Sequence, residues 1–335
     1  MKTWKKAGLT ALAGSLVATS AFAGAVTVSG SANLTYTGNT GAEDTGGAVG
    51  VGDGNDGSRW GMAKSISFAG SGEMDNGWTV SLATSFLNAG ASSGSVTLDM
   101  GDAGSLNFEG GTSGRGIGKI ADMMPTADED VGNGIDTNGS TASGGLTGAV
   151  SGGVTGFHYS KAMDMVEIGV GYAPKGAAGS SAGAVSGSGG KSNVSAFIKI
   201  DPMDGLEIGF GSGEKGTGSG DNSQTDDHST AYITYVYGPL TVGYQQSEVD
   251  TWSTTANDEV TRWGVLYAVN DEMSISYQDH VNDDTTATDE EATGWSASYT
   301  VGSMTFAAQK NSATNVGNIV ANESEHTEVG VTFAF

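Results

Sequence analysis

Residues 327–335 read Thr-Glu-Val-Gly-Val-Thr-Phe-Ala-Phe, and this stretch at the end of the chain carries the pattern that decides the fold. Every second position is apolar and smaller or polar residues stand between, the apolar set being Val329, Val331, Phe333 and Phe335. Successive side chains of a β-strand point to opposite faces, so the alternation predicts a strand with one apolar and one polar face.

The same period of two recurs along the chain, at residues 26–36, 78–86, 194–200, 263–269 and 295–301. Helical spacing of apolar residues recurs nowhere after residue 24. The sequence therefore predicts an all-β protein built from strands of about ten residues.

The connections between these strands alternate strictly between short and long. Short turns are predicted at 74–77, 101–104, 162–165, 201–205, 238–239, 270–272 and 302–303. Long polar loops are predicted at 38–57, 88–94, 110–154, 174–191, 212–228, 248–258, 280–292 and 311–325. A soluble sandwich has no reason to gather its long loops at one end. A transmembrane antiparallel β-barrel does, with short periplasmic turns and long external loops.

This pattern predicts sixteen strands, with the apolar face toward lipid and the Ser, Thr, Asn and Gly face toward a water-filled lumen. The uncertain pair lies at residues 95–109, where the apolar alternation is short for a tilted crossing. Without that pair the barrel has fourteen strands.

Composition excludes several classes of protein. The 335 residues carry a formal net charge of −24, which argues against nucleic acid as a partner because phosphates would be repelled. The chain has no cysteine, which excludes a disulfide scaffold and thiolate metal sites. Hydrophobic residues make up only 37% of the chain, too few for a large apolar core.

The first 23 residues form a predicted signal peptide. Lys2, Lys5 and Lys6 precede a weakly apolar stretch, and Ala21-Phe22-Ala23 is a small-x-small cleavage site. The apolar stretch is short and interrupted by hydroxyl residues, which favours a cleaved signal over a membrane anchor. We expect residues 24–335 to form the exported mature barrel.

The chain resembles the general porins of Gram-negative outer membranes, most closely the alphaproteobacterial and marine porins. The resemblance rests on the opening strand 26–30 (Val-Thr-Val-Ser-Gly), the turn 75–77 (Asp-Asn-Gly), and the final strand ending in Phe335. It implies a passive diffusion channel for small hydrophilic solutes and ions, usually a homotrimer, set in outer-membrane lipid and lipopolysaccharide. It also implies that Phe335 is an assembly signal for the barrel-assembly machinery.

The resemblance further implies that the longest loop, 110–154, folds inward to narrow the channel. Its charged residues are Arg115, Lys119, Asp122, Asp128, Glu129 and Asp130. In the porins such a loop faces basic residues across the lumen and sets up a transverse field. The candidate pore-wall residues here are Arg59, Asp99, Lys161, Lys199 and Arg262, which are fewer bases than the family pattern has. The alternative interpretation is a solvated surface loop.

Acidic residues gather in the long loops and predict mild cation selectivity, because a mouth of one sign concentrates counter-ions. The same acids suggest a calcium site at Asp53, Asn55 and Asp56, although such a loop normally needs more ligands at fixed spacing. Diffuse screening is the favoured interpretation, and no cofactor is expected.

Three other functions remain as alternatives. An enzyme is disfavoured, since His158 beside Tyr159 and Ser160 is the one position that suggests a Ser-His-acid triad. A substrate-specific channel would need an ordered track of aromatic and charged residues, whereas the inward positions are mostly small. A Gly-rich surface structural protein or adhesin predicts neither the alternating loops nor the terminal phenylalanine.

Overall fold

The computed structural model describes residues 26–41, 57–88, 90–110, 115–135, 156–174, 191–217, 224–250, 257–284, 288–316, 320 and 322–335. The predicted signal peptide and the calcium candidates Asp53, Asn55 and Asp56 lie outside these residues. Of the loop 110–154, the structure describes the first residue and the segment 115–135. No helix among the described residues is long and apolar enough to cross a membrane.

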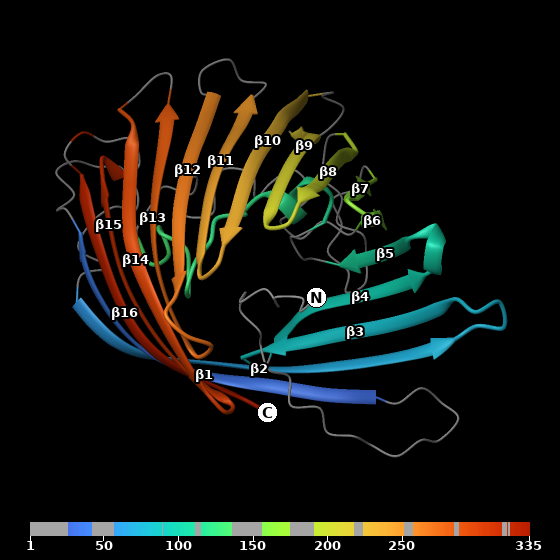
Figure 1. The fold of residues 1–335 in the computed structure, drawn as a ribbon, viewed down its shortest axis with the longest axis horizontal. Coiled ribbons are helices and arrows are strands. Elements are labelled where there is room, and N and C mark those ends of the chain that lie inside the picture. The colour runs from blue at the N-terminus through green and yellow to red at the C-terminus, as the bar shows by residue number, and fades with distance from the viewer. Residues whose placement is uncertain are drawn as a thin grey trace.

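The described residues form sixteen strands and two short 3-10 helices, which Figure 1 shows arranged as one ring. The strands are β1 (Val26–Gly41), β2 (Gly57–Glu73), β3 (Thr79–Leu87), β4 (Gly90–Asp99), β5 (Ser105–Gly110), β6 (Gly156–Met163), β7 (Val166–Ala173), β8 (Asn193–Met203), β9 (Leu206–Thr217), β10 (Gln224–Tyr237), β11 (Leu240–Asp250), β12 (Asn257–Ala268), β13 (Met273–Asp284), β14 (Glu290–Val301), β15 (Met304–Thr314) and β16 (Glu323–Ala334). The helices are η1 (Gly101–Ala103) and η2 (Gly116–Ile120).

The ring is a closed antiparallel barrel in which each strand pairs with its neighbours in sequence and β1 pairs with β16. Closure removes the open edges that a sheet cannot leave in lipid. At the seam, Gly30 and Phe335 exchange backbone hydrogen bonds of 2.8 and 3.0 Å. The Phe335 ring lies over Gly30, where an added Cβ would come within 2.7 Å of it. The predicted all-β barrel is confirmed.

All seven predicted turns lie between paired strands, as expected. The uncertain pair at 95–109 also forms, as β4 and β5, so the barrel has sixteen strands rather than fourteen. β4 reaches crossing length because it begins at Gly90, inside the stretch predicted as a loop. β5 remains short, with six residues.

The alternation of side chains follows the predicted faces. On β12, Trp263 and Tyr267 are exposed on the outer face, whereas Arg262, directly before Trp263, is fully buried on the inner face. Lys64 of β2 pairs with Ala32 and shares the outward register of the exposed Met62 and Ile66.

The wall is lower on one side. β3 ends at Leu87, which pairs with Gly90 of β4 on one side and with Ser65 of β2 on the other. β2 continues past that level to Gly57, paired with β1. The strands β3 to β7 are six to ten residues long, against eleven to seventeen in the remaining wall.

Candidate functional site

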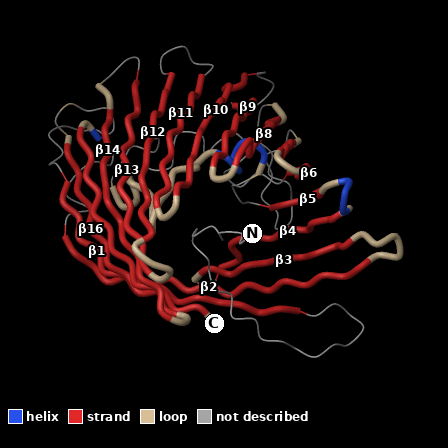
Figure 2. The backbone as a smooth tube through the Cα atoms, in the orientation of Figure 1, coloured by secondary structure: helices blue, strands red, loops and turns tan. Residues whose placement is uncertain are grey.

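Residues 115–135, here called the inner segment, lie inside the barrel against the inner face of β7 to β16. Figure 2 shows this segment as the short blue helix and tan loop within the ring of strands. Its first residues form η2, which contacts β7, β8, β9 and β10. The remainder has no regular structure, so its backbone groups must find partners on the wall.

Apolar contacts hold the inner segment at both ends. At its start, Ile120 packs with Phe197 of β8 and Tyr232 of β10. At its end, Val131 and Ile135 pack with inward alanines of β14 and β15, and with Val316. Inward positions of a porin-like barrel would otherwise meet water, so each apolar residue there indicates a covered patch of wall.

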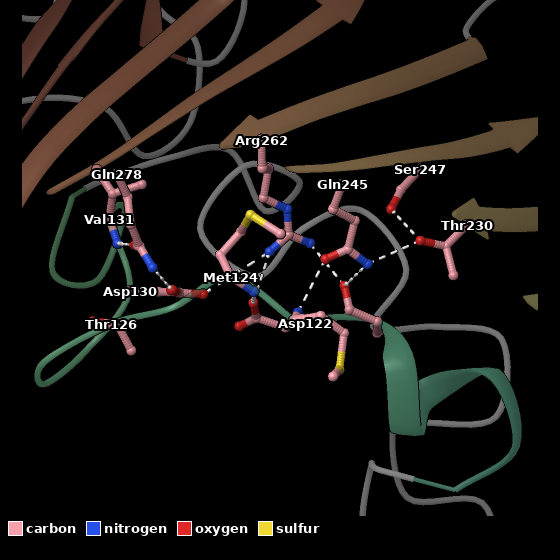
Figure 3. Close-up of polar contacts among 12 residues, drawn as sticks. Asp122, Met124, Thr126, Asp130, Val131, Thr230, Gln245, Ser247, Arg262 and Gln278 are labelled. Atoms are coloured by element: carbon pink, nitrogen blue, oxygen red, sulfur yellow. Dashed lines mark hydrogen bonds and ion pairs between the residues drawn. The ribbon is translucent and has the colours of Figure 1, made fainter. Parts of the chain in front are cut away.

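Gln245 of β11 holds the segment beyond η2. Its Oε1 accepts a hydrogen bond from the Met123 amide at 3.0 Å, and its Nε2 donates to the carbonyls of Ile120 and Ala121 at 2.8 and 3.1 Å. Nε2 also lies 2.9 Å from Thr230 Oγ1, which in turn contacts Ser247 (Figure 3). One fully buried side chain thus satisfies three backbone groups of the segment.

Gln278 of β13 does the same nearer the end of the segment. It accepts from the Val131 amide at 2.7 Å, and donates to Asp130 Oδ1 at 2.7 Å and to the Pro125 carbonyl at 3.2 Å. The amides of Ala127 and Asp128 donate to the hydroxyls of wall serines at 2.9 and 3.2 Å, the serines being Ser276 and Ser296. The wall therefore supplies the hydrogen bonds that a helix or strand would have made internally.

Arg262 of β12 is fully buried beneath the middle of the segment. Its guanidinium donates to Asp122 Oδ1 at 3.1 Å and to the Ala121 carbonyl at 2.8 Å. Asp130 Oδ2 lies 3.9 Å away. A buried guanidinium is tolerated only when paired and hydrogen-bonded, and Asp122 provides the counter-charge with Asp130 close by (Figure 3).

The pKa values of Asp122 and Asp130 are shifted in opposite directions. Burial and the hydrogen bond to Asp122 raise the pKa of Asp130 well above its ordinary value. Burial also opposes ionisation of Asp122, but the hydrogen bond from Asp130 and the Arg262 charge outweigh it and lower the pKa of Asp122. Asp130 Oδ2 is buried without another hydrogen-bond partner in the described structure. Asp130 is therefore the more readily protonated of the two acids, and Asp122 carries the negative charge beside Arg262.

Three carboxylates near the end of the segment have no such guanidinium. Burial, Glu129 and Glu328 of β16 raise the pKa of Asp128 to about 6. Burial and Glu328 likewise raise the pKa of Glu129. Glu129 is exposed on the free side of the segment, and the Asp122 side chain is 45% exposed. The side of the inner segment that faces away from the wall is therefore acidic.

Three of the basic candidates, Lys119, Lys199 and Arg262, each have an acid as partner. Lys119 forms an ion pair with Glu167 of β7 and lies 5.5 Å from the centre of the Phe197 ring. Lys199 of β8 is inward, as expected, and lies 3.0 Å from Glu207 of β9. Arg262 lies under the loop, bonded to Asp122 and the Ala121 carbonyl, and not across the lumen from it.

Lys161 and Asp99, both predicted as pore-wall residues, do not act as such in the structure. Lys161 pairs with Ile168 of β7 and shares the register of the exposed Phe157, so it lies on the outer face and is not a pore-wall residue. The inward set on β6 is the other parity, which includes the buried His158. Asp99 is in the inward register, but its carboxylate accepts from the Gly101 amide at 2.9 Å and stabilises the turn after β4.

Arg59 lies in the inward register of β2, opposite Thr37 and near the loop end of the strand. Arg115 begins the inner segment as the residue before η2. The structure thus joins Arg262, Asp122 and Asp130 in one cluster, and leaves Arg59, Asp99 and Lys161 away from it.

Sequence reasoning missed the two glutamines and Glu328. All three occupy inward positions of their strands, which parity alone could have revealed. Parity does not reveal which inward positions lie under the inner segment, because that depends on the path of an irregular loop. No group of three or more His, Asp or Glu residues able to hold a metal ion occurs in the described part of the chain.

Comparisons with known proteins agree with this architecture. A family model described as Gram-negative porin matches residues 8–280. A porin structure refined at 1.8 Å resolution has a TM-score of 0.66 at 13% identity, covering 93% of this chain and 100% of that one. An anion-selective porin from Comamonas acidovorans gives 0.63 at 13% with the same coverage. A loop L8 deletion mutant of OmpT from Vibrio cholerae also gives 0.63 at 13%, again with the same coverage. No curated protein sequence matches the chain.

Proposed function

The chain belongs to the Gram-negative porin family and is an outer-membrane diffusion channel, and from that premise we propose that it passes small hydrophilic solutes with a mild preference for cations. The inner segment narrows the lumen in this proposal, as residues 110–154 do in the family resemblance. One observation supports the cation preference more than any other. Acids line the free side of the segment, whereas Lys119, Lys199 and Arg262 each have a carboxylate partner.

In this proposal, the carboxylates of the inner segment and of the wall beside it determine the selectivity. Glu129 and Glu328 raise the pKa of Asp128, and Glu328 raises that of Glu129, so the fields of these carboxylates add in the same region. Carboxylates in a narrow passage raise the local concentration of cations and lower that of anions. An anion-selective porin has the same fold, so selectivity must come from such side chains and not from the barrel.

The wall facing the open lumen favours non-specific passage. Its inward positions on β1 to β3 include Ser29, Ser67 and Ser85, which are cross-strand neighbours in one row. The inward aromatic residues Phe197 and Tyr232 are buried beneath the inner segment and do not line the lumen. A substrate-specific channel, the second candidate, would need such rings exposed along the path. We also propose that the chain catalyses no reaction, in keeping with a family of non-enzymatic channels.

The experiment is reconstitution into a planar bilayer under a salt gradient. We expect a reversal potential of the sign that cation preference gives. The double variant Asp128→Asn/Glu129→Gln should move it toward zero. The control Glu323→Gln/Glu325→Gln removes the same charge from the outward register of β16 and should leave it unchanged. Anion preference in the unaltered protein would overturn the proposal.

Porins are typically trimeric, and we propose a homotrimer seated on the low side of the wall at β3 to β5. Outward apolar side chains such as Leu82 and Val96 are exposed there. Light scattering of the detergent complex and conductance steps in threes test this state. We further propose that residues 1–23 are removed on export, which amino-terminal sequencing of the purified protein tests, and that Phe335 is read by the barrel-assembly machinery.

A further inference from the structure

The inner face of the barrel is interrupted by glycines directly beneath the inner segment. Gly211 of β9, Gly243 of β11, Gly264 of β12 and Gly294 of β14 all occupy inward positions. Glycine weakens a strand interior, and it commonly marks a place where another part of the chain approaches closely. The inner segment makes that approach at each of the four positions.

The deepest of these contacts is at the middle of the segment. Gly243 and Gly264 are direct cross-strand partners, so together they leave a pit in the wall. A Cβ added at Gly243 would lie 2.7 Å from Pro125 Cδ and 3.1 Å from Met124 Cε. A Cβ added at Gly264 would lie 3.2 Å from the same Pro125 Cδ. Pro125 therefore sits in a pit that exists only because both residues lack a side chain.

The other two glycines support the segment on either side of this pit. A Cβ at Gly211 would lie 2.8 and 2.9 Å from Ile117 and Ile120, the buried side chains of η2. A Cβ at Gly294 would lie 3.0 Å from Val131, and closer still to Asn311, whose amide donates to the Asn133 carbonyl at 3.0 Å. The four positions therefore follow the segment from η2 to its last turn.

We propose that these glycines, with Gly243 and Gly264 as the centre, set how far the inner segment projects into the lumen and so determine the width of the channel. The inference rests on the proposed function, in which the segment narrows the pore. Carbon atoms pack at about 3.5–4.0 Å, so a methyl group at Gly243 must displace the Pro125 ring by about 1 Å. The wall lies behind the methyl group, so the displacement is toward the lumen.

The test measures single-channel conductance and the rate at which sugars of increasing size enter proteoliposomes. Gly243→Ala should lower the conductance and shift the size limit downward, and Gly243→Val should do so further. Gly330→Ala is the matched control, because Gly330 is also inward but its added Cβ meets Thr35 and Asn33 of the wall instead of the segment. That variant should conduct like the unaltered protein.

A second substitution separates a change of pore width from a general loss of structure. Pro125→Ala removes the Cδ atom that Gly243→Ala displaces, so the double variant should recover the conductance of Pro125→Ala alone. If Gly243→Ala does not fold, as judged by heat-modifiable migration, Gly264→Ala replaces it, because its contacts are longer. Unchanged conductance in the folded variants, or an equal loss in Gly330→Ala, would overturn the proposal.

One further variant tests the premise separately. Glu129→Trp places a large ring on the exposed side of the segment without touching the pit. If it lowers conductance and Gly243→Ala does not, the glycine proposal is wrong and the narrowing role stands. If Glu129→Trp leaves conductance unchanged, the segment does not narrow the lumen and the proposed function is wrong in that respect.

Discussion

The inner face of this barrel has two arcs with different chemistry. The covered arc, β7 to β16, carries large polar side chains such as Gln245, Arg262 and Gln278, with glycines between them. The open arc, β1 to β4, carries small hydroxyl residues that bond to each other, as in Ser31 with Ser65 and Ser67 with Ser85, both at 2.8 Å.

The difference reflects what each arc faces. Water can satisfy a serine wall, and small side chains leave the lumen wide. An irregular peptide segment cannot satisfy its own amides and carbonyls, so the covered arc must supply long side chains that reach them. The covered arc is therefore packed like a protein core, and the open arc is a surface exposed to solvent. Both have the same alternation of inward and outward residues.

The largest contrast should come from removing the buried charge of the covered arc. Arg262→Gln leaves Asp122 without its counter-charge, and breaking a buried pair costs about 3–5 kcal/mol. Because Asp122 is half exposed, we expect about 3 kcal/mol in the free energy of unfolding. Denaturant unfolding in detergent, followed by tryptophan fluorescence, measures it. Arg59→Gln on the open arc should change the value by less than about 0.5 kcal/mol, and equal effects would remove the distinction between the arcs.

A smaller loss of stability should follow Gln245→Met, which keeps the side-chain length but removes the bonds to the inner segment. The Met123 amide and two carbonyls then lose their partner, at a cost of about 1–3 kcal/mol for an unsatisfied buried group. Ser67→Ala is the matched change on the open arc and should alter the unfolding midpoint very little. A Gln245→Met protein as stable as the original would show that the segment is held by its apolar ends alone.

The open arc should respond in conductance instead of stability. Ser85→Trp places a large ring on an inward position of β3 that the inner segment does not cover. We expect a lower single-channel conductance with an unfolding midpoint close to that of the original. A large loss of stability without a change in conductance would mean that this arc is packed and not open to water.

The smallest effect should be a dependence on pH near the end of the segment. With its pKa raised to about 6, Asp128 is about nine-tenths ionised at pH 7 and about one-tenth at pH 5. Acidification over this range removes negative charge from the lumen, so the cation preference should fall as the pH falls. Reversal potentials at pH 7 and pH 5 measure the change. It should be smaller in Asp128→Asn, and a preference that rises on acidification would contradict the assignment.

Much of the fold could be predicted from the sequence because it depends on local patterns. The period of two defined the strands, and short turns such as 238–239 defined their order. The lumen chemistry was harder. The positions of Arg262 and Lys199 on the inner face followed from parity, but their partners did not, since those depend on an irregular segment and on cross-strand neighbours. Lys161 was predicted on the inner face, but it shares the outward register of Phe157, and the inward residues of β6 are those in register with His158.

The bonds between Gly30 and Phe335 join β1 to the residue that follows β16. Because β16 closes the ring on β1, a product that lacks β16 leaves two unpaired strand edges. Contacts this distant in sequence also carry the full entropic cost of bringing the ends of the chain together. Closure of the barrel therefore depends on pairing between the first and last of its sixteen described strands, the most distant pair in the sequence.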